Sequence, residues 1–470
     1  MSTPTLSTKT TILIISKTIT SVINFLSGLI LARYLTKSDY ATYSQIMLIG
    51  STSAIVTVGV QQGLFYFIPL SEEKHRRSIA INGLFLGIIL ILIPLLIFFF
   101  FKKQISLSLN NEKLYSLWTV AILYIFSFSI AGFTDSVLIN FNKVNKLAII
   151  NIMTSILIII PIILVKNDIK IIVCCVALSY FFMFICNLIF LGDIKLLCSI
   201  NINEMRSQME YAFPIMISSV LGIIGRRIDQ YMISIMFTPE DYAIYTRGAF
   251  DIPFIDIITS SIFTILIPEL TTLIKNNEYS QSLKLWRDAV YKIALLSFPL
   301  AIFLIVMAKP LMIFLFSEKY IESAPIFRVY SLFLILQIAI YGTIPRVTGR
   351  TDIIYKMAIL LSCTNILINY PLIKIFGPIG ASIGTISASF TAILYILSKN
   401  ATLLKTSLSH IFPWKRLFQI LIISLVCSVV LFLPFLRNMG AFIQLSLGFL
   451  SYAIMVAFIY ETCREHLKPW

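Results

Sequence analysis

Three basic residues lie inside stretches of sequence that are otherwise apolar: Lys17, Arg226 and Arg227. A basic side chain at the centre of a membrane-spanning helix costs roughly 2.5–3.5 kcal/mol on the insertion scale. Such residues rarely face lipid, and they suit contact with an anionic group that has lost its water. We therefore take Arg226 as the first candidate for binding an anionic substrate, with Arg227 and Lys17 next.

The spacing of the polar residues around these cations is helical. Residues at steps of three and four share one face of a helix. One such stripe surrounds Lys17, and it consists of Lys17, Thr20, Ser21, Asn24, Ser27 and Gly28. The stripe around Arg226 consists of Ser219, Gly222, Arg226, Asp229 and Gln230. Asn24 and Asp229 would supply hydrogen bonds to the substrate or orient the cations.

Each charge also has a simpler interpretation. Lys17 lies near the start of its span and could extend to the cytoplasmic headgroups. Arg226 and Asp229 are three residues apart and could neutralise each other, while Arg227 points about 100° away and could pair with an acid on a neighbouring helix. Asp256, in DIPFIDIITSS, is either a coupling site for a proton or cation or a charge partner, and we favour the partner role. Other acids in or near spans are Asp135, Asp251 and Glu269.

The sequence contains no pattern for covalent chemistry. A nucleotide-binding G-x-x-x-x-G-K-[ST] motif is absent, and His75, His410 and His466 are far apart, without metal-ligand spacing. The seven cysteines mostly lie in apolar stretches and show no paired spacing. We expect no catalytic residue, no metal site and no cofactor, and hence not an enzyme.

The elements that position these residues must be membrane-spanning helices. Of the 470 residues, 58% are hydrophobic and 13% are charged, whereas a soluble domain is about 25% charged. The N-terminal apolar stretch lacks a signal-peptide cleavage site, so we interpret it as a retained first span. Apolar windows predict about fourteen spans, at 11–35, 44–70, 79–101, 115–139, 147–165, 170–191, 212–237, 249–274, 290–308, 324–345, 357–376, 380–398, 416–435 and 440–460.

The connectors between these spans are short and polar, so no separate catalytic domain is expected. With the N-terminus in the cytoplasm, the cytoplasmic connectors carry more Lys and Arg than the outside ones, which is the usual bias. The formal net charge of +15 is therefore explained by topology and anionic headgroups. We expect membrane lipids as partners and no nucleic acid.

A short motif occurs twice, as TKSDYATY at 36–43 and as TPEDYAIY at 238–245. The copies are 202 residues apart and follow the first and seventh predicted spans, so both lie on the outside. This predicts two six-helix repeats related by an axis along the membrane normal, at 1–200 and 201–400, with an appended helix pair at 401–470. The same offset places Asn24 and Arg226 at equivalent positions of the two repeats. Thr36 and Asp39 look like a helix cap, with direct substrate contact as the alternative, and the tyrosines suit the membrane interface.

Four segments carry a resemblance to a known family. They are LSGLILARYLTKSDYATYSQI at 26–46, DQYMISIMFTPEDYAIYTRGAF at 229–250, KPLMIFLFSEKYIESAPIFRVYSLFLI at 309–335 and LINYPLIKIFGPIGASIGTISASF at 367–390. In this order they resemble the polysaccharide-synthesis (O-antigen) flippases. These belong to the multidrug/oligosaccharidyl-lipid/polysaccharide exporter superfamily. The ordered set covers most of the first 400 residues.

The resemblance implies an all-α protein of the bacterial inner membrane, with two six-helix bundles that alternate between inward and outward openings. It implies a polyprenyl-pyrophosphate-linked oligosaccharide as substrate, moved from the cytoplasmic to the outer face. Polysaccharide polymerase and chain-length proteins are the expected protein partners. A drug/cation antiporter of the same superfamily is the alternative, but such proteins often use an acid in the inner helices of the first half, where the first span here carries Lys17. A non-transporting scaffold would not need charges inside its spans.

Overall fold

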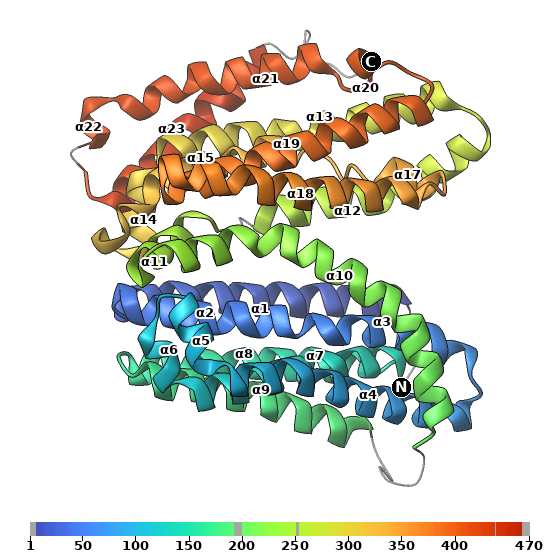
Figure 1. Ribbon diagram of the computed structural model, residues 1–470. Helices are drawn as coiled ribbons and strands as arrows, with labels where there is room; N and C mark the ends of the chain where they lie inside the picture. Colours follow the sequence, from blue (N-terminus) through green and yellow to red (C-terminus); the bar gives the residue numbers. More distant parts are fainter. Residues whose placement is uncertain (1–5, 192–199, 251–252, 438, 463–470) are drawn as a thin grey trace. The chain divides into compact units, whose positions relative to one another are not determined.

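A computed structural model describes residues 6–191, 200–250, 253–437 and 439–462. Every regular element in these ranges is helical, which confirms the predicted all-α class (Figure 1). The contacts divide the chain into two compact units. Unit 1 contains residues 1–223 and 234–243, and unit 2 contains residues 224–233 and 244–470.

Unit 1 is built around helix α7, which packs against α2, α3, α4 and α9. In the apolar window of α7, 61% of residues are buried, whereas in that of α1 only 11% are. Helix α1 packs chiefly on α8, and α8 packs on α9. The helices of unit 1 are α1 (Leu6–Tyr34), α2 (Lys37–Ser53), α3 (Ile55–Leu70), α4 (Glu73–Phe100), α5 (Lys102–Ser108), α6 (Glu112–Ser116), α7 (Trp118–Asn140), α8 (Val144–Val165) and α9 (Ile169–Leu191).

Helices α10 (Ile202–Met236) and α11 (Pro239–Gly248) contribute residues to both units. Near the start of α10, Glu204 accepts a hydrogen bond of 2.7 Å from Asn82 of α4. Near its end, Ser234 accepts one of 2.7 Å from Gln45 of α2, and Asn110 donates to the carbonyl of Ile235 at 2.6 Å. Both ends of α10 are thus fixed within unit 1, while residues 224–233 belong to unit 2.

Unit 2 has its core around Trp286 of α13, which is fully buried and packs edge-on against Phe263. Helices α18 and α19 lie side by side (Figure 1), joined at Gly377 with φ +64°, a conformation that favours glycine. The remaining helices are α12 (Pro253–Lys275), α13 (Tyr279–Val306), α14 (Ala308–Phe316), η1 (Glu318–Tyr320), α15 (Ser323–Ser331), α16 (Phe333–Leu336), α17 (Thr343–Val347), α18 (Thr351–Phe376), α19 (Pro378–Leu403), α20 (Leu408–Ile411), α21 (Trp414–Cys427), η2 (Ser428–Phe432), α22 (Pro434–Arg437) and α23 (Ala441–Thr462).

Among the described residues, ten helices are long and apolar enough to cross a membrane, or up to twelve if each of two bent helix pairs is one span. The sequence predicted about fourteen. The other two predicted spans, at 249–274 and 324–345, coincide with α12 and with the three short helices α15, α16 and α17. The predicted polytopic membrane class is confirmed, and the second of these regions is interrupted where a single helix was expected.

The duplicated motif is a helix cap in both copies. The Thr36 hydroxyl accepts from the Asp39 amide at 3.1 Å, and the Thr238 hydroxyl accepts from the Asp241 amide at 3.2 Å. Each threonine also donates to the aspartate of its own copy, at 2.6 Å and 2.7 Å. The predicted capping role is therefore confirmed. The expected position of the tyrosines at the membrane interface stays a prediction; Tyr40, Tyr242 and Tyr245 are buried within the protein.

Candidate functional site

Helix α1 presents the polar stripe predicted from its sequence. Lys17, Ser21 and Asn24 are exposed, and Thr20 is half-buried. Ser27 is buried, and its hydroxyl donates a hydrogen bond of 2.8 Å to the backbone carbonyl of Ile23. Exposed polar groups on a membrane-spanning helix are costly against lipid and are tolerated where the helix lines water or ligand. This face of unit 1 is therefore suited to a polar ligand.

A second polar group in unit 1 lies within electrostatic range of Lys17. It is Asp135 of α7, whose carboxylate interacts with Lys17 and accepts a hydrogen bond of 2.9 Å from Asn187 of α9. Asn187 also donates to the Thr134 hydroxyl at 2.8 Å. The sequence showed that Asp135 lies in a span, but it did not connect Asp135 with Lys17. That connection depends on how α1, α7 and α9 pack.

The two arginines of α10 differ in their surroundings. Arg226 is exposed, and within the described part of the chain it forms no hydrogen bond or ion pair. Arg227 is half-buried, donates to Gln230 at 3.4 Å and interacts electrostatically with Asp229. The pairing of Arg226 with Asp229, considered from their spacing, is therefore replaced by an interaction between Arg227 and Asp229. Because no described side chain neutralises Arg226, we keep it as the first candidate for contact with a ligand.

Asp229 is buried, with 4% of its surface exposed. Its carboxylate accepts hydrogen bonds from the Tyr245 hydroxyl at 2.6 Å and from the Thr385 hydroxyl at 3.4 Å. The amide of Gln230 donates to the same carboxylate at 2.9 Å. These contacts favour an orienting role for Asp229 over direct contact with substrate. Neither Tyr245 nor Thr385 could be assigned to Asp229 from the sequence, because they lie on α11 and α19.

The backbone of α10 approaches α18 closely at Gly225. The side-chain amide of Asn365 donates to the backbone carbonyl of Gly225 at 2.7 Å, and the side-chain amide of Asn369 donates to Oδ1 of Asn365. A Cβ at position 225 would collide with the Ser362 hydroxyl. These contacts fix the segment that carries Arg226, Arg227 and Asp229.

Within the described part of the chain, no group of three or more His, Cys, Asp or Glu side chains could hold a metal ion. Asp256 lies on α12, but its side chain is outside the described part of the structure. Its role as a coupling site or charge partner stays a prediction.

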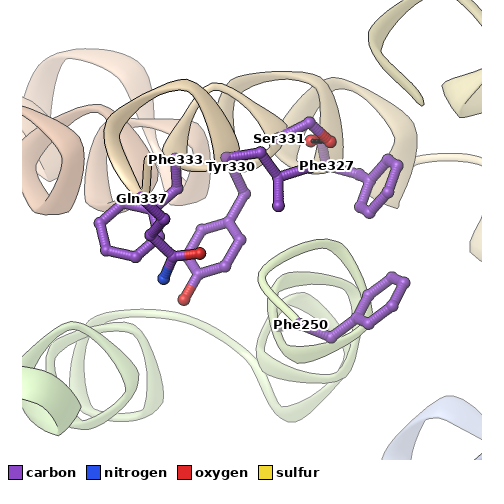
Figure 2. Close-up of a pocket in the computed structure, with 7 residues that line it drawn as sticks. Phe250, Phe327, Tyr330, Ser331, Phe333 and Gln337 are labelled. Carbon is purple, nitrogen blue, oxygen red and sulfur yellow. Dashed lines mark hydrogen bonds between the residues drawn. The ribbon is translucent and has the colours of Figure 1, made fainter. Parts of the chain in front are cut away.

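A small aromatic pocket lies elsewhere in unit 2. Figure 2 shows Phe250 opposite Phe327 in this pocket, which is also lined by Tyr330 of α15 and by Gln337, the residue after α16. Phe250 and Phe327 stack with ring centroids 5.1 Å apart. The cavity volume is only about 10 Å³, far below the roughly 300–1,000 Å³ usual for ligand sites. We do not assign an oligosaccharide to it.

Replacing Tyr245 with phenylalanine should destabilise unit 2. The change removes the 2.6 Å hydrogen bond to the buried Asp229 carboxylate, and an unsatisfied buried polar group costs about 1–3 kcal/mol. We expect a lower thermal unfolding midpoint of the purified protein in detergent. Tyr355→Phe, at a tyrosine that is 50% exposed, is the matched control. Equal midpoints for the two variants would show that the Tyr245 hydroxyl contributes nothing to stability.

The fold is shared with solved structures of membrane transporters. The structure superposes on the lipid II flippase MurJ, in an inward closed conformation, with a TM-score of 0.74 and 18% identity, over 96% of this chain and 99% of that one. An inward-facing multidrug resistance transporter of the MATE family gives a TM-score of 0.62 and 15% identity, over 83% and 96%. A transporter of the MOP superfamily from Pyrococcus furiosus gives a TM-score of 0.53 and 14% identity, over 84% of this chain and 95% of that one.

The sequence defines the family more closely. The profile of the polysaccharide biosynthesis protein family matches residues 30–325, more than half of the chain, so this protein belongs to that family. The capsular polysaccharide biosynthesis protein CapF of Staphylococcus aureus is 25% identical over 207 residues, covering 43% of this chain and 52% of CapF. The match thus spans about half the length of CapF. The predicted membership of a polysaccharide-synthesis family is confirmed.

Proposed function

We propose that this protein is a flippase that moves a polyprenyl-pyrophosphate-linked oligosaccharide, an O-antigen or capsule repeat unit, from the cytoplasmic to the outer face of the bacterial inner membrane. The observation that carries the proposal is the exposed Lys17, Ser21 and Asn24 face on α1. This helix crosses the membrane with only 11% of its apolar window buried. A polar face so open is suited to a polar, charged substrate.

The substrate class sets physical demands that these residues meet. Its sugar and pyrophosphate must cross about 30 Å of hydrocarbon while the polyprenyl tail remains in lipid. Moving a phosphate out of water is prohibitively costly unless cations or hydrogen-bond donors replace its hydration. Lys17 in unit 1 and Arg226 in unit 2 are exposed cations inside apolar helices. Each would bind the anionic head at some stage of transport.

The other candidate residues would act around these cations. Asn24 is exposed on α1 and would donate hydrogen bonds to sugar hydroxyls. Arg227 would contact the head directly or hold Asp229, which in turn fixes the segment that carries Arg226. We propose alternating access as the mechanism, with Asp256 as a charge partner or coupling residue. Polymerase and chain-length proteins remain the proposed partners on the outer face.

A drug/cation antiporter is the competing proposal, and the MATE-like fold is consistent with it. Such a transporter would bind cations in its pathway. The exposed charges described here, Lys17 and Arg226, are themselves cationic and would repel a cationic drug. The charge of the two faces therefore favours an anionic substrate.

Deleting the gene tests the proposed function in cells. We expect the lipid-linked oligosaccharide to accumulate on the cytoplasmic face of the inner membrane, because later steps cannot reach it there, and surface polysaccharide to disappear. Restoring the gene should reverse both effects. Normal polysaccharide with increased sensitivity to cationic drugs would favour the antiporter instead.

A further inference from the structure

Asp135 is the one charged residue of α7, and the proposed function does not use it. Its side chain is half-buried. One carboxylate oxygen accepts a hydrogen bond of 2.9 Å from Asn187, and the other accepts none from the described residues. Asn187 is fully buried, and its own carbonyl oxygen also lacks a partner within the described structure. Asp135 and Asn187, which we call the Asp135 cluster, therefore have an oxygen that could take one more proton or hydrogen bond.

Few charged groups act on this carboxylate. Among the described residues, Lys17 of α1 and Tyr180 of α9 interact electrostatically with Asp135. A phenol is uncharged near neutral pH, so Lys17 is the one ionic partner of Asp135 within the described part of the chain. No direct ion pair joins them among the described residues, but Leu13, one turn before Lys17, packs against the apolar cluster that contains Ala131 and Leu138, on either side of Asp135.

The charge state of Asp135 decides what Lys17 offers to a ligand. When the carboxylate is ionised, its field offsets that of the nearby ammonium, and an approaching pyrophosphate meets little net positive charge. When the carboxylate takes a proton from water, the field of Lys17 is uncompensated. Anion binding at Lys17 and proton binding at Asp135 must then favour each other, since coupling between two sites is reciprocal.

We propose that Asp135 is a protonation switch that exposes the charge of Lys17, so that proton uptake at Asp135 and binding of the anionic head group at Lys17 occur together. The inference rests on the proposed function and adds a site to it. In the orientation expected from the sequence, α7 ends and α1 begins on the cytoplasmic side, which places both groups in the half of the membrane from which substrate enters.

A proton suits the cluster better than a metal cation. Hard cations take six or more oxygen ligands. The described neighbours supply the Asp135 carboxylate, the Asn187 carbonyl oxygen and the Thr134 hydroxyl, and that hydroxyl already accepts a hydrogen bond from Asn187. A proton needs only the free carboxylate oxygen.

The test measures binding of farnesyl pyrophosphate, a short polyprenyl pyrophosphate, to the purified full-length protein in mildly acidic and mildly alkaline buffer. We expect wild-type affinity to rise about tenfold on acidification, within the range of coupling between sites. Asp135→Asn, which keeps the size and the contact with Asn187, should bind tightly at both pH values. Lys17→Gln should bind weakly at both, and adding Asp135→Asn to it should change nothing.

The probe itself takes up protons on acidification, but it does so equally with every variant, so the comparison between variants isolates the switch. If Asp135→Asn binds with the same pH dependence as wild type, or more weakly, the switch is refuted. Binding of farnesyl pyrophosphate is also compared in sodium and in choline salts at the same ionic strength. If sodium strengthens binding to wild type but not to Asp135→Asn, the bound ion is Na⁺ and the assignment of a proton is overturned. No binding to folded wild-type protein would instead count against the proposed function.

Discussion

Replacing Arg226 with alanine should abolish surface polysaccharide while the protein remains in the membrane at its normal level. Arg226 is exposed, and no described side chain neutralises it. Hydrogen bonds to charged groups contribute about 1.5–3 kcal/mol each, so losing one such contact should slow transport about 10- to 150-fold. Surface polysaccharide and protein level are measured in cells that carry each variant.

Two further variants make this result specific. Arg226→Lys keeps the charge but loses the two-pronged geometry of the guanidinium, so partial export is expected. Arg206→Ala is the matched control, because Arg206 lies on the same helix in an exposed pair with Glu210, and such pairs contribute little. Normal export with Arg226→Ala, or an equal loss with Arg206→Ala, would contradict a role for Arg226 in binding the head group.

Gly225→Ala should destabilise the protein and impair transport together. The added methyl group would collide with the Ser362 hydroxyl and approach the Ser362 backbone on α18. Forcing extra volume into a packed contact costs about 1–3 kcal/mol. Separation of the helices would also strain the 2.7 Å hydrogen bond from Asn365 to the Gly225 carbonyl. The measurement is the thermal unfolding midpoint in detergent, together with export in cells.

Gly222 provides the control for this substitution. A Cβ at position 222 meets no described atom within 4 Å, and alanine is up to about 1 kcal/mol better than glycine in a helix. Gly222→Ala should therefore match or exceed wild-type stability. Adding Ser362→Gly to Gly225→Ala removes the colliding side chain and should recover part of the loss. Equal behaviour of the two glycine variants would show that the close approach of α10 and α18 is unimportant.

The sequence predicted those parts of the site that depend on one helix alone. The insertion cost of Lys17 and Arg226 and the helical spacing around Asn24 are local properties, and the structure finds all three side chains exposed. Their role in binding remains a prediction. The caps at Thr36 and Thr238 were also predictable, because a cap involves residues only three positions apart.

Contacts between distant helices could not be predicted in the same way. The hydrogen bond from Tyr245 to Asp229 joins α11 to α10, and the interaction of Lys17 with Asp135 joins α1 to α7. Hydropathy windows also merged α15, α16 and α17 into one span, because they average over breaks in an apolar stretch. Periodicity gives the face of a helix that is polar, but packing decides which partner that face meets.

The central claim is that this chain alone moves a lipid-linked oligosaccharide across a bilayer. The most direct measurement reconstitutes the purified protein in liposomes that carry a fluorescent polyprenyl-pyrophosphate oligosaccharide. It follows what fraction of the label is destroyed over time by an external reductant that cannot cross the membrane and that bleaches the label irreversibly. We predict that this fraction rises above one half with wild-type protein and stays near one half with Arg226→Ala and with empty liposomes. Equal fractions in all three would contradict the account.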